Sequence, residues 1–198
     1  IFYLQPKCNM ATGELVSMEA LARWQKSDGT FVSPEEFIPL FESSGFITRF
    51  DMYIWKSVCK TLAAWQDKGC KLVPISINVS MIDITNIDVP QYLSMLTEQY
   101  HISPEYLPVE ITESVFAESN TIVKNTITRF HKKGFYVLMD DFGSGYSSLN
   151  VLKDANVDYL KLDMKFMQID AKNKGKGIQI LKSIVDMAYR LGLVIIAE

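Results

Sequence analysis

The fold is decided by the stretch Phe135-Tyr136-Val137-Leu138-Met139-Asp140-Asp141-Phe142-Gly143. Five apolar residues, Phe135–Met139, lie between Gly134 and a pair of aspartates, and glycines follow. An unbroken apolar run of this length between turn signals is typical of a parallel strand that is covered on both faces. The stretch therefore predicts a buried strand whose carboxyl end carries acidic side chains.

Six further runs have strand character, and helical patterns lie between most of the strands. The other strand runs are Ile1–Pro6, Glu14–Ala22, Leu72–Val79, Leu107–Thr112, Asp158–Leu162 and Leu193–Ala197. The helical patterns begin after Ser33, repeat apolar residues every four positions from Ile54, and span Asn120–Lys133 and Ile178–Leu191. Each pattern is closed by a glycine, namely Gly45, Gly69, Gly134 and Gly192. This alternation predicts a single α/β domain with a largely parallel sheet.

The composition excludes several classes of protein. Hydrophobic residues make up 48% of the chain and charged residues 22%, which are ordinary values for a globular domain. With 20 basic and 23 acidic residues the net charge is −3, so bulk charge would hold the chain neither to DNA or RNA nor to a membrane. No apolar run is long enough for a membrane span, and no signal peptide is visible. Three cysteines without paired spacing indicate reduced thiols in the cytoplasm.

Polar side chains follow nearly all of the apolar strands. They are Glu19, Asn78, Glu110, Asp140 with Asp141, Lys161 with Asp163, and Glu198. In a barrel of parallel strands the carboxyl ends open on one face, so these groups would converge there. Converging carboxylates repel one another unless cations neutralise them, and hard oxygen ligands suit Mg²⁺ or Mn²⁺ rather than zinc. The alternative is that each acid separately caps a helix or forms a surface salt bridge.

Histidine contributes little to the candidate chemistry. His101 and His131 are the only two histidines, and both fall in polar, helix-like stretches where we expect them to be solvated. Their scarcity argues against a nucleophile activated by histidine and against a histidine-bound metal.

Six motifs, in order along the chain, resemble those of the EAL-domain cyclic di-GMP phosphodiesterases. They are Glu19-Ala20-Leu21-Ala22-Arg23-Trp24, Ile77-Asn78-Val79-Ser80, Glu110-Ile111-Thr112-Glu113, Asp140-Asp141-Phe142-Gly143, Leu160-Lys161-Leu162-Asp163 and Ala197-Glu198. The resemblance covers the whole chain, so residues 1–198 are identified as one EAL domain. It implies an α/β fold of the TIM-like (β/α)8 barrel type whose first strand runs antiparallel to the others.

Only seven of the eight strands of such a barrel are visible, so we expect the barrel to be truncated after the seventh strand. A polypeptide that ends at Glu198 would leave the edges of its first and seventh strands unpaired, and we expect it to self-associate. About 45–50 further residues would complete a barrel of the usual ~250 residues.

The resemblance also implies an activity, the hydrolysis of one phosphodiester bond of cyclic di-GMP to linear pGpG with two Mg²⁺ or Mn²⁺ ions. The first ion would be held by Glu19, Asn78, Glu110 and Asp140. Asp140 would bridge to a second ion, which is held also by Asp141 and Glu198. Lys161 would orient the attacking water, and Glu198 is the candidate general base.

The same resemblance implies contacts with the dinucleotide by Gln5, Leu21 and Arg23. Arg23 would bind a phosphate, because its planar guanidinium can donate two parallel hydrogen bonds. Glu113 would hold the loop Gly143–Ser148 in place. The alternatives are a salt bridge of Arg23 beside Trp24 and, for Gln5, a plain surface amide.

The wider context expected from the resemblance is a homodimer, fused to a sensor or GGDEF domain. The start at Ile1 fits a piece of a longer protein, which would be cytoplasmic or anchored to a membrane by another segment. Two other functions stay open. Degenerate relatives act as cyclic di-GMP receptors or interaction modules, and enolase-like barrels combine carboxylate-bound Mg²⁺ with a lysine base. The intact ligand set favours an enzyme over a receptor, and the Glu19–Arg23 signature argues against the enolase-like barrel.

Overall fold

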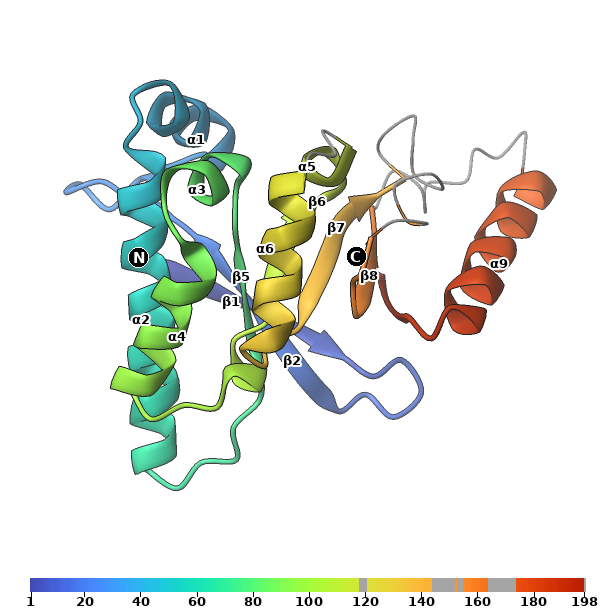
Figure 1. Cartoon of the computed structure of the whole chain (residues 1–198), viewed down its shortest axis with the longest axis horizontal. Coiled ribbons are helices and arrows are strands. Elements are labelled where there is room, and N and C mark those ends of the chain that lie inside the picture. The colour runs from blue at the N-terminus through green and yellow to red at the C-terminus, as the bar shows by residue number, and fades with distance from the viewer. Residues whose placement is uncertain (118–120, 144–151, 153–154, 164–173, 198) are drawn as a thin grey trace.

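A seven-stranded sheet with the order β1-β2-β5-β6-β7-β8-β9 is the centre of the structure (Figure 1). The computed structural model describes the chain apart from residues 118–120, 144–151, 153–154, 164–173 and 198. The strands are β1 (Phe2–Cys8), β2 (Leu15–Ala22), β5 (Ile75–Asn78), β6 (Val109–Thr112), β7 (Val137–Phe142), β8 (Tyr159–Leu162) and β9 (Val194–Ala197). β1 and β2 are antiparallel, and each later pair is parallel. The α/β fold with an antiparallel first strand is confirmed.

All seven strands predicted from the sequence are present, although several begin later than predicted. Leu107 and Phe135 are buried in the loops before their strands, since an apolar side chain can join the core without pairing its backbone. The sequence did not reveal a second, two-stranded sheet of β3 (Trp24–Gln25) and β4 (Phe31–Val32). Within the described part of the chain β1 and β9 are the two edges of the main sheet and do not pair with each other, as in a TIM-like barrel that is not closed.

Helices line the outside of the sheet. They are α1 (Pro34–Ser43), α2 (Ile47–Asp67), α3 (Met81–Asn86), α4 (Val89–Gln99), the 3₁₀ turn η1 (Pro104–Tyr106), α5 (Glu113–Ala117), α6 (Thr121–Lys132) and α9 (Lys174–Arg190). The four predicted helical patterns correspond to α1, α2, α6 and α9. In Figure 1, α2, α4 and α6 lie beside one another, and α9 lies at the far end of the sheet. None of the described helices has both the length and the apolar character needed to span a membrane.

Helices α3, α4 and α5 were not predicted from the sequence, and α3 and α5 are only 6 and 5 residues long. α3 begins with a capping box in which the Ser80 hydroxyl accepts from the Asp83 amide and the Asp83 carboxylate accepts from the Ser80 amide. α4 begins at Asp88, whose side chain accepts from the Gln91 amide. Of the predicted caps, Ser33 occupies the N-cap position of α1 but makes no side-chain capping bond.

The core lies between the sheet and the helices that cover it. Ile77, Val109 and Val137 on three neighbouring strands are fully buried, as are Val58 and Leu62 on α2. Burial of such side chains stabilises each by about 1.5–3 kcal/mol relative to exposure. Packing of the apolar face therefore fixes the strands in register. The polar residues on the other face and at the strand ends then point to one common region.

Helix α9 is less buried than its apolar stripe predicts. Ala188 is fully buried, whereas Ile178 is 41% and Val185 43% exposed. α9 contacts β9, the edge strand, in which Val194 is 54% exposed. In the part of the chain that the structure describes, the sheet therefore ends in an apolar strand with one free edge.

We expect the 198-residue polypeptide to self-associate in solution through β9, because an exposed apolar edge strand can pair with a second chain. Light scattering checks this outcome. Val194→Lys places a charge on the edge and should shift the population toward the monomer. Met10→Lys adds the same charge in the β1–β2 turn and should not. A monodisperse monomer of the unsubstituted polypeptide would contradict the expectation.

Candidate metal centre and adjoining cavity

Three carboxylates from three different strands meet at the carboxyl ends of the sheet. Glu19 comes from β2, Glu110 from β6 and Asp140 from β7, and one oxygen atom of each lies within 4.8 Å of the others. Glu19 is 5%, Glu110 1% and Asp140 9% exposed. The parallel pairing of β2 with β5, of β5 with β6 and of β6 with β7 sets this arrangement, because it brings strands that are far apart in the sequence side by side.

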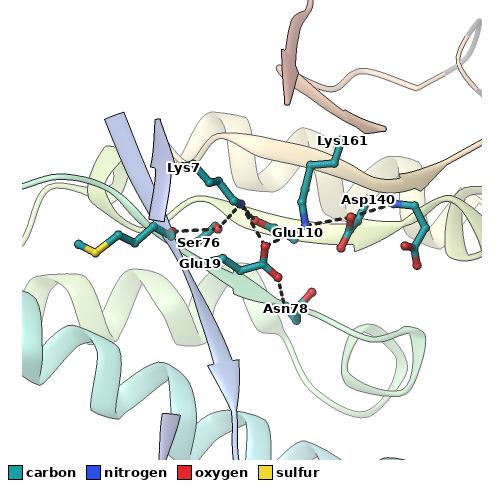
Figure 2. A network of polar contacts seen from close by, with 9 residues as sticks. Lys7, Glu19, Ser76, Asn78, Glu110, Asp140 and Lys161 are labelled. Carbon is teal, nitrogen blue, oxygen red and sulfur yellow. Dashed lines mark hydrogen bonds and ion pairs between the residues drawn. The ribbon is translucent and has the colours of Figure 1, made fainter. Parts of the chain in front are cut away.

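Asn78 and Lys161 complete the centre that the sequence predicts (Figure 2). Asn78 Nδ2 donates to Glu19 Oε1 at 3.3 Å. Lys161 on β8 is 1% exposed, and its Nζ lies 2.9 Å from Glu19 Oε2, 2.6 Å from Glu110 Oε2 and 2.9 Å from Asp140 Oδ1. The structure therefore brings together five of the predicted site residues.

Lys7 on β1 is a sixth member of the centre, and the sequence analysis did not identify it. Its Nζ lies 3.2 Å from Glu19 Oε2 and 2.5 Å from Glu110 Oε1, and it donates to Ser76 Oγ at 3.1 Å. Figure 2 shows Lys7 and Lys161 approaching Glu110 from two sides. The alternation of side chains along a β-strand could have identified Lys7 from the sequence. Lys7 lies two positions after Gln5, the residue opposite Glu19 in the β1–β2 pair, and alternate residues share a face.

The charges of this centre perturb one another. Burial opposes ionisation of Glu19, yet the ammonium groups of Lys161 and Lys7 outweigh it and hold the pKa of this carboxyl below its usual value. Burial, and then the neighbouring Glu19, raise the pKa of Glu110, and burial also raises the pKa of Asp140. Although burial favours the neutral amine, the three carboxylates raise the pKa of Lys161. Two ammonium groups therefore compensate three buried carboxylates only in part.

This donor set fits a divalent cation. Glu19, Glu110 and Asp140 offer carboxylate oxygens and Asn78 an amide oxygen, and Mg²⁺ and Mn²⁺ prefer such hard ligands. The raised pKa values of Glu110 and Asp140 indicate that the site holds more negative charge than its surroundings stabilise. A bound dication would relieve that excess. Both histidines lie elsewhere, so the candidate metal ligands among the described residues are oxygen donors.

Of the two remaining predicted metal ligands, the structure describes only Asp141, which is not part of this group. Asp141 follows Asp140 in a left-handed conformation with φ 56°, at a bulge in the pairing of β7 with β8. Its amide donates to Asp140 Oδ1 at 2.8 Å, which turns the chain after the first aspartate. Asp141 is exposed and does not belong to the cluster of three carboxylates. Glu198 lies outside the described residues.

Glu113 connects the centre to the loop after β7. It is 3% exposed, and its Oε2 accepts from the Gly143 amide at 3.0 Å. Gly143 has φ 99°, a conformation in which other residues are strained. The rest of the predicted loop, residues 144–148, lies outside the described part of the chain.

A cavity of about 400 Å³ adjoins the acidic centre. It is lined by residues that include Leu21, Arg23, Asp51, Asn78 and Ser80. Of the predicted substrate contacts, Leu21 and Arg23 therefore face the cavity. Gln5 is exposed on β1, opposite Glu19, and is not among the lining residues.

Arg23 is not held by an acid. Its Nη1 donates to the Ala22 carbonyl at 2.8 Å, and its guanidinium lies 5.8 Å from the centre of the Tyr3 ring. Among the described residues it forms no ion pair, so the salt bridge considered from the sequence is not present. Its charge is thus available to an anion in the cavity.

A pair of acids on α2 and α3 forms another polar feature beside the cavity. Asp83 is fully buried, and its Oδ2 accepts from the amide and the hydroxyl of Ser80, whereas its Oδ1 has no hydrogen-bond partner. Burial, and then the charge of Asp83, raise the pKa of Asp51 to about 9. Asp51 therefore keeps its proton near neutral pH. The sequence analysis did not find this pair.

His131 differs from the expectation of a solvated side chain. Its Nε2 lies 3.0 Å from Asp158 Oδ2, and the same oxygen accepts from the Val137 amide at 2.7 Å. His131 thereby joins the end of α6 to the starts of β7 and β8, at the opposite end of the strands from the acidic centre. It takes no part in the candidate site.

The fold and the site together define a barrel-type α/β protein with an oxygen-donor centre at the carboxyl ends of its strands. Residues 1–198 match the family model described as the EAL domain. The chain therefore belongs to the EAL domain family.

Curated relatives support this membership. The chain is 35% identical over 197 residues to the probable cyclic di-GMP phosphodiesterase PdeB of Escherichia coli K12, a match that covers 99% of the chain and 37% of that protein. It is 33% identical over 200 residues to the cyclic di-GMP phosphodiesterase PdeR of the same organism, covering 100% of the chain and 30% of PdeR. The chain thus spans about a third of the length of these relatives.

Solved structures support the fold. A structure described as the PaMucR phosphodiesterase in complex with c-di-GMP superposes with a TM-score of 0.90 at 26% identity, covering 100% of this chain and 79% of that one. An EAL domain protein from Listeria monocytogenes EGD-e superposes with a TM-score of 0.81 at 26% identity, covering 98% and 75%.

We expect the raised pKa of Asp51 to make the stability of the protein depend on pH. The folded state holds a proton that unfolded Asp51 releases, so the free energy of unfolding should fall as pH rises from the usual aspartate range toward 9. Asp51→Asn replaces the titrating carboxyl group with a neutral amide. It should therefore flatten the fall in the free energy of unfolding with pH and stabilise the protein at pH 8.5 by about 1 kcal/mol or more. Denaturant unfolding at pH 6 and pH 8.5 measures the effect. Asp186→Asn, at an exposed position on α9, is the control, and parallel pH profiles for Asp51→Asn and the unsubstituted protein would contradict the expectation.

Proposed function

We propose that this domain hydrolyses one phosphodiester bond of cyclic di-GMP to give linear pGpG, with Mg²⁺ or Mn²⁺ as its cofactor. The observation that carries the proposal is the meeting of Glu19, Glu110, Asp140, Asn78 and Lys161 beside a cavity lined by Arg23, which has no acidic partner among the described residues. The names of the relatives PdeB and PdeR and the c-di-GMP bound to the similar PaMucR structure support the choice of substrate.

The cavity suits a guanine nucleotide in its chemistry. Its volume of about 400 Å³ lies within the range of small-molecule sites, about 300–1,000 Å³. Arg23 supplies a cation for a phosphate, and Leu21 supplies an apolar contact. Asp51, which lines the cavity, offers carboxyl oxygens to the N–H groups of a guanine edge.

Two ions are proposed for the reaction. Glu19, Asn78, Glu110 and Asp140 would hold the first, and Asp140 with Asp141 and Glu198 would hold the second. When bound, a pair of divalent ions neutralises the charge of the diester and makes water acidic enough to attack at neutral pH.

The chain's own groups position the reactants. Lys161 already contacts three of the carboxylates, so its ammonium group would orient the attacking water among them. Glu198 would accept the proton of that water as general base. Glu113, through its bond to Gly143, would hold the loop after β7 next to the site. Arg23 would fix the phosphate, and Gln5 would reach the dinucleotide from β1.

The second candidate function is a cyclic di-GMP receptor that binds without turnover. The presence of the complete group Glu19, Asn78, Glu110, Asp140 and Lys161 favours the enzyme, because a receptor has no use for a charge-crowded centre. The proposed setting is a cytoplasmic homodimer in which the domain is fused to a sensor or GGDEF domain.

Incubation of the purified protein with cyclic di-GMP and Mn²⁺, with chromatographic separation of the products, tests the activity. Glu19→Ala and Asp140→Asn should each reduce the rate by about 100-fold or more, since each removes a group of the reaction centre. Glu14→Ala, at an exposed position just before β2, should keep full activity. More than a tenth of the original rate in either site variant would exclude the proposed centre. Binding without product in the unsubstituted protein would favour the receptor.

Arg23→Ala separates binding from chemistry. We expect it to weaken the binding of cyclic di-GMP by ~1–3 kcal/mol, the value of a charge-assisted contact to phosphate. Calorimetry in Ca²⁺, which we expect to support binding but not turnover, measures the affinity. Arg49→Ala removes an exposed arginine from α2 and should leave it unchanged. An unaltered affinity of Arg23→Ala would show that this arginine does not bind the phosphate.

A further inference from the structure

Lys7 is a partly buried cation whose position on β1 brings it into contact with the acidic centre. Its side chain is 9% exposed, and its ammonium group bonds to Glu110 Oε1 and Glu19 Oε2 (Figure 2). Lys161 bonds to the other oxygen of Glu110, Oε2, and also to Glu19 Oε2. Both oxygens of Glu110 are thus occupied by ammonium groups.

A divalent ion at this centre needs oxygens that the two lysines hold. Carboxylate oxygens bind a divalent cation at about 2.0–2.6 Å. An ammonium group that is hydrogen-bonded to the same lone pair must move away before the cation can bind there. A positive charge next to a dication also lowers its affinity, since two charges about 4 Å apart still interact by several kcal/mol near a protein surface. One of the two lysines therefore opposes the entry of the ion.

The structure indicates that Lys7 is the lysine that yields. Lys161 contacts three carboxylates and is 1% exposed on a central strand, whereas Lys7 contacts two and lies on the edge strand β1. Lys7 has a further acceptor in Ser76 Oγ at 3.1 Å, and the Ser76 hydroxyl itself donates to the Met18 carbonyl at 3.2 Å. The Ser76 oxygen can keep the ammonium group when Glu110 Oε1 is taken by another ligand.

We propose that Lys7 is an internal cation that holds Glu19 and Glu110 together in the metal-free protein and competes with the divalent ion for Glu110. It acts as a positioning residue, and its charge sets the affinity for the ion. This inference rests on the proposed metal centre. It predicts two opposite effects of removing the charge: the metal-free protein is destabilised, and the ion binds more tightly.

The test compares Lys7→Met with the unsubstituted protein in Mn²⁺ calorimetry and in thermal unfolding in EDTA. Lys7→Met should bind Mn²⁺ at least about tenfold more tightly, and it should melt at a lower temperature in EDTA. Lys7→Arg keeps the charge and should retain an affinity near the original. Lys60→Met removes an exposed lysine from α2 and controls for the change in net charge.

The outcomes separate this inference from the proposed function. If the unsubstituted protein binds Mn²⁺ and Lys7→Met binds it equally or more weakly, Lys7 has only a structural role and the inference is wrong. If neither binds Mn²⁺, the metal centre itself is wrong, and the inference fails with it. If only Lys7→Met binds measurably, the competition is supported. Lys7→Gln, which can still bond to Ser76, replaces Lys7→Met should circular dichroism show the latter unfolded.

Discussion

The crowding of buried carboxylates at the carboxyl ends of the strands is the constraint on which the rest of the structure depends. Glu19, Glu110 and Asp140 lie within 4.8 Å of one another, in a place where an uncompensated charge costs several kcal/mol. Lys161 and Lys7 offset part of this cost. Acids and lysines can lie this close only if the strands are fixed in register. The polar centre therefore depends on the apolar core that holds the strands in place.

The opposite face of the sheet supplies that rigidity. Ile77 and Val109 pair across β5 and β6 and are fully buried, and the next pair along, Asn78 and Glu110, carries the polar groups. Trp55 on α2 packs against this region and donates from Nε1 to the Asn78 carbonyl at 3.0 Å. A helix far from Asn78 in the sequence thus fixes the end of its strand. We expect a change in this packing to displace Asn78 while the overall fold is kept.

The centre and the cavity beside it differ in how they treat charge. In the centre, ammonium groups keep Glu19 ionised and leave the pKa values of Glu110 and Asp140 raised, which suits the entry of a cation. Beside the cavity, burial and then the charge of Asp83 raise the pKa of Asp51 so that it holds a proton, and Arg23 has no acidic partner among the described residues. The acidic centre is therefore suited to a cation, and the cavity is suited to an anion that carries hydrogen-bonding groups.

The sequence by itself determined the seven strands, the α/β class and the acids Glu19, Glu110 and Asp140 that interrupt the apolar runs, because apolar runs and the charges within them are local signals. Only the tertiary structure decided that Lys7 reaches Glu110, that Asp51 meets Asp83, and that His131 joins Asp158 rather than water. Each of these pairs joins residues distant in the chain, and its energy depends on burial. The spacing of residues along a sequence predicts neither the distance between two packed elements nor how much solvent their packing excludes.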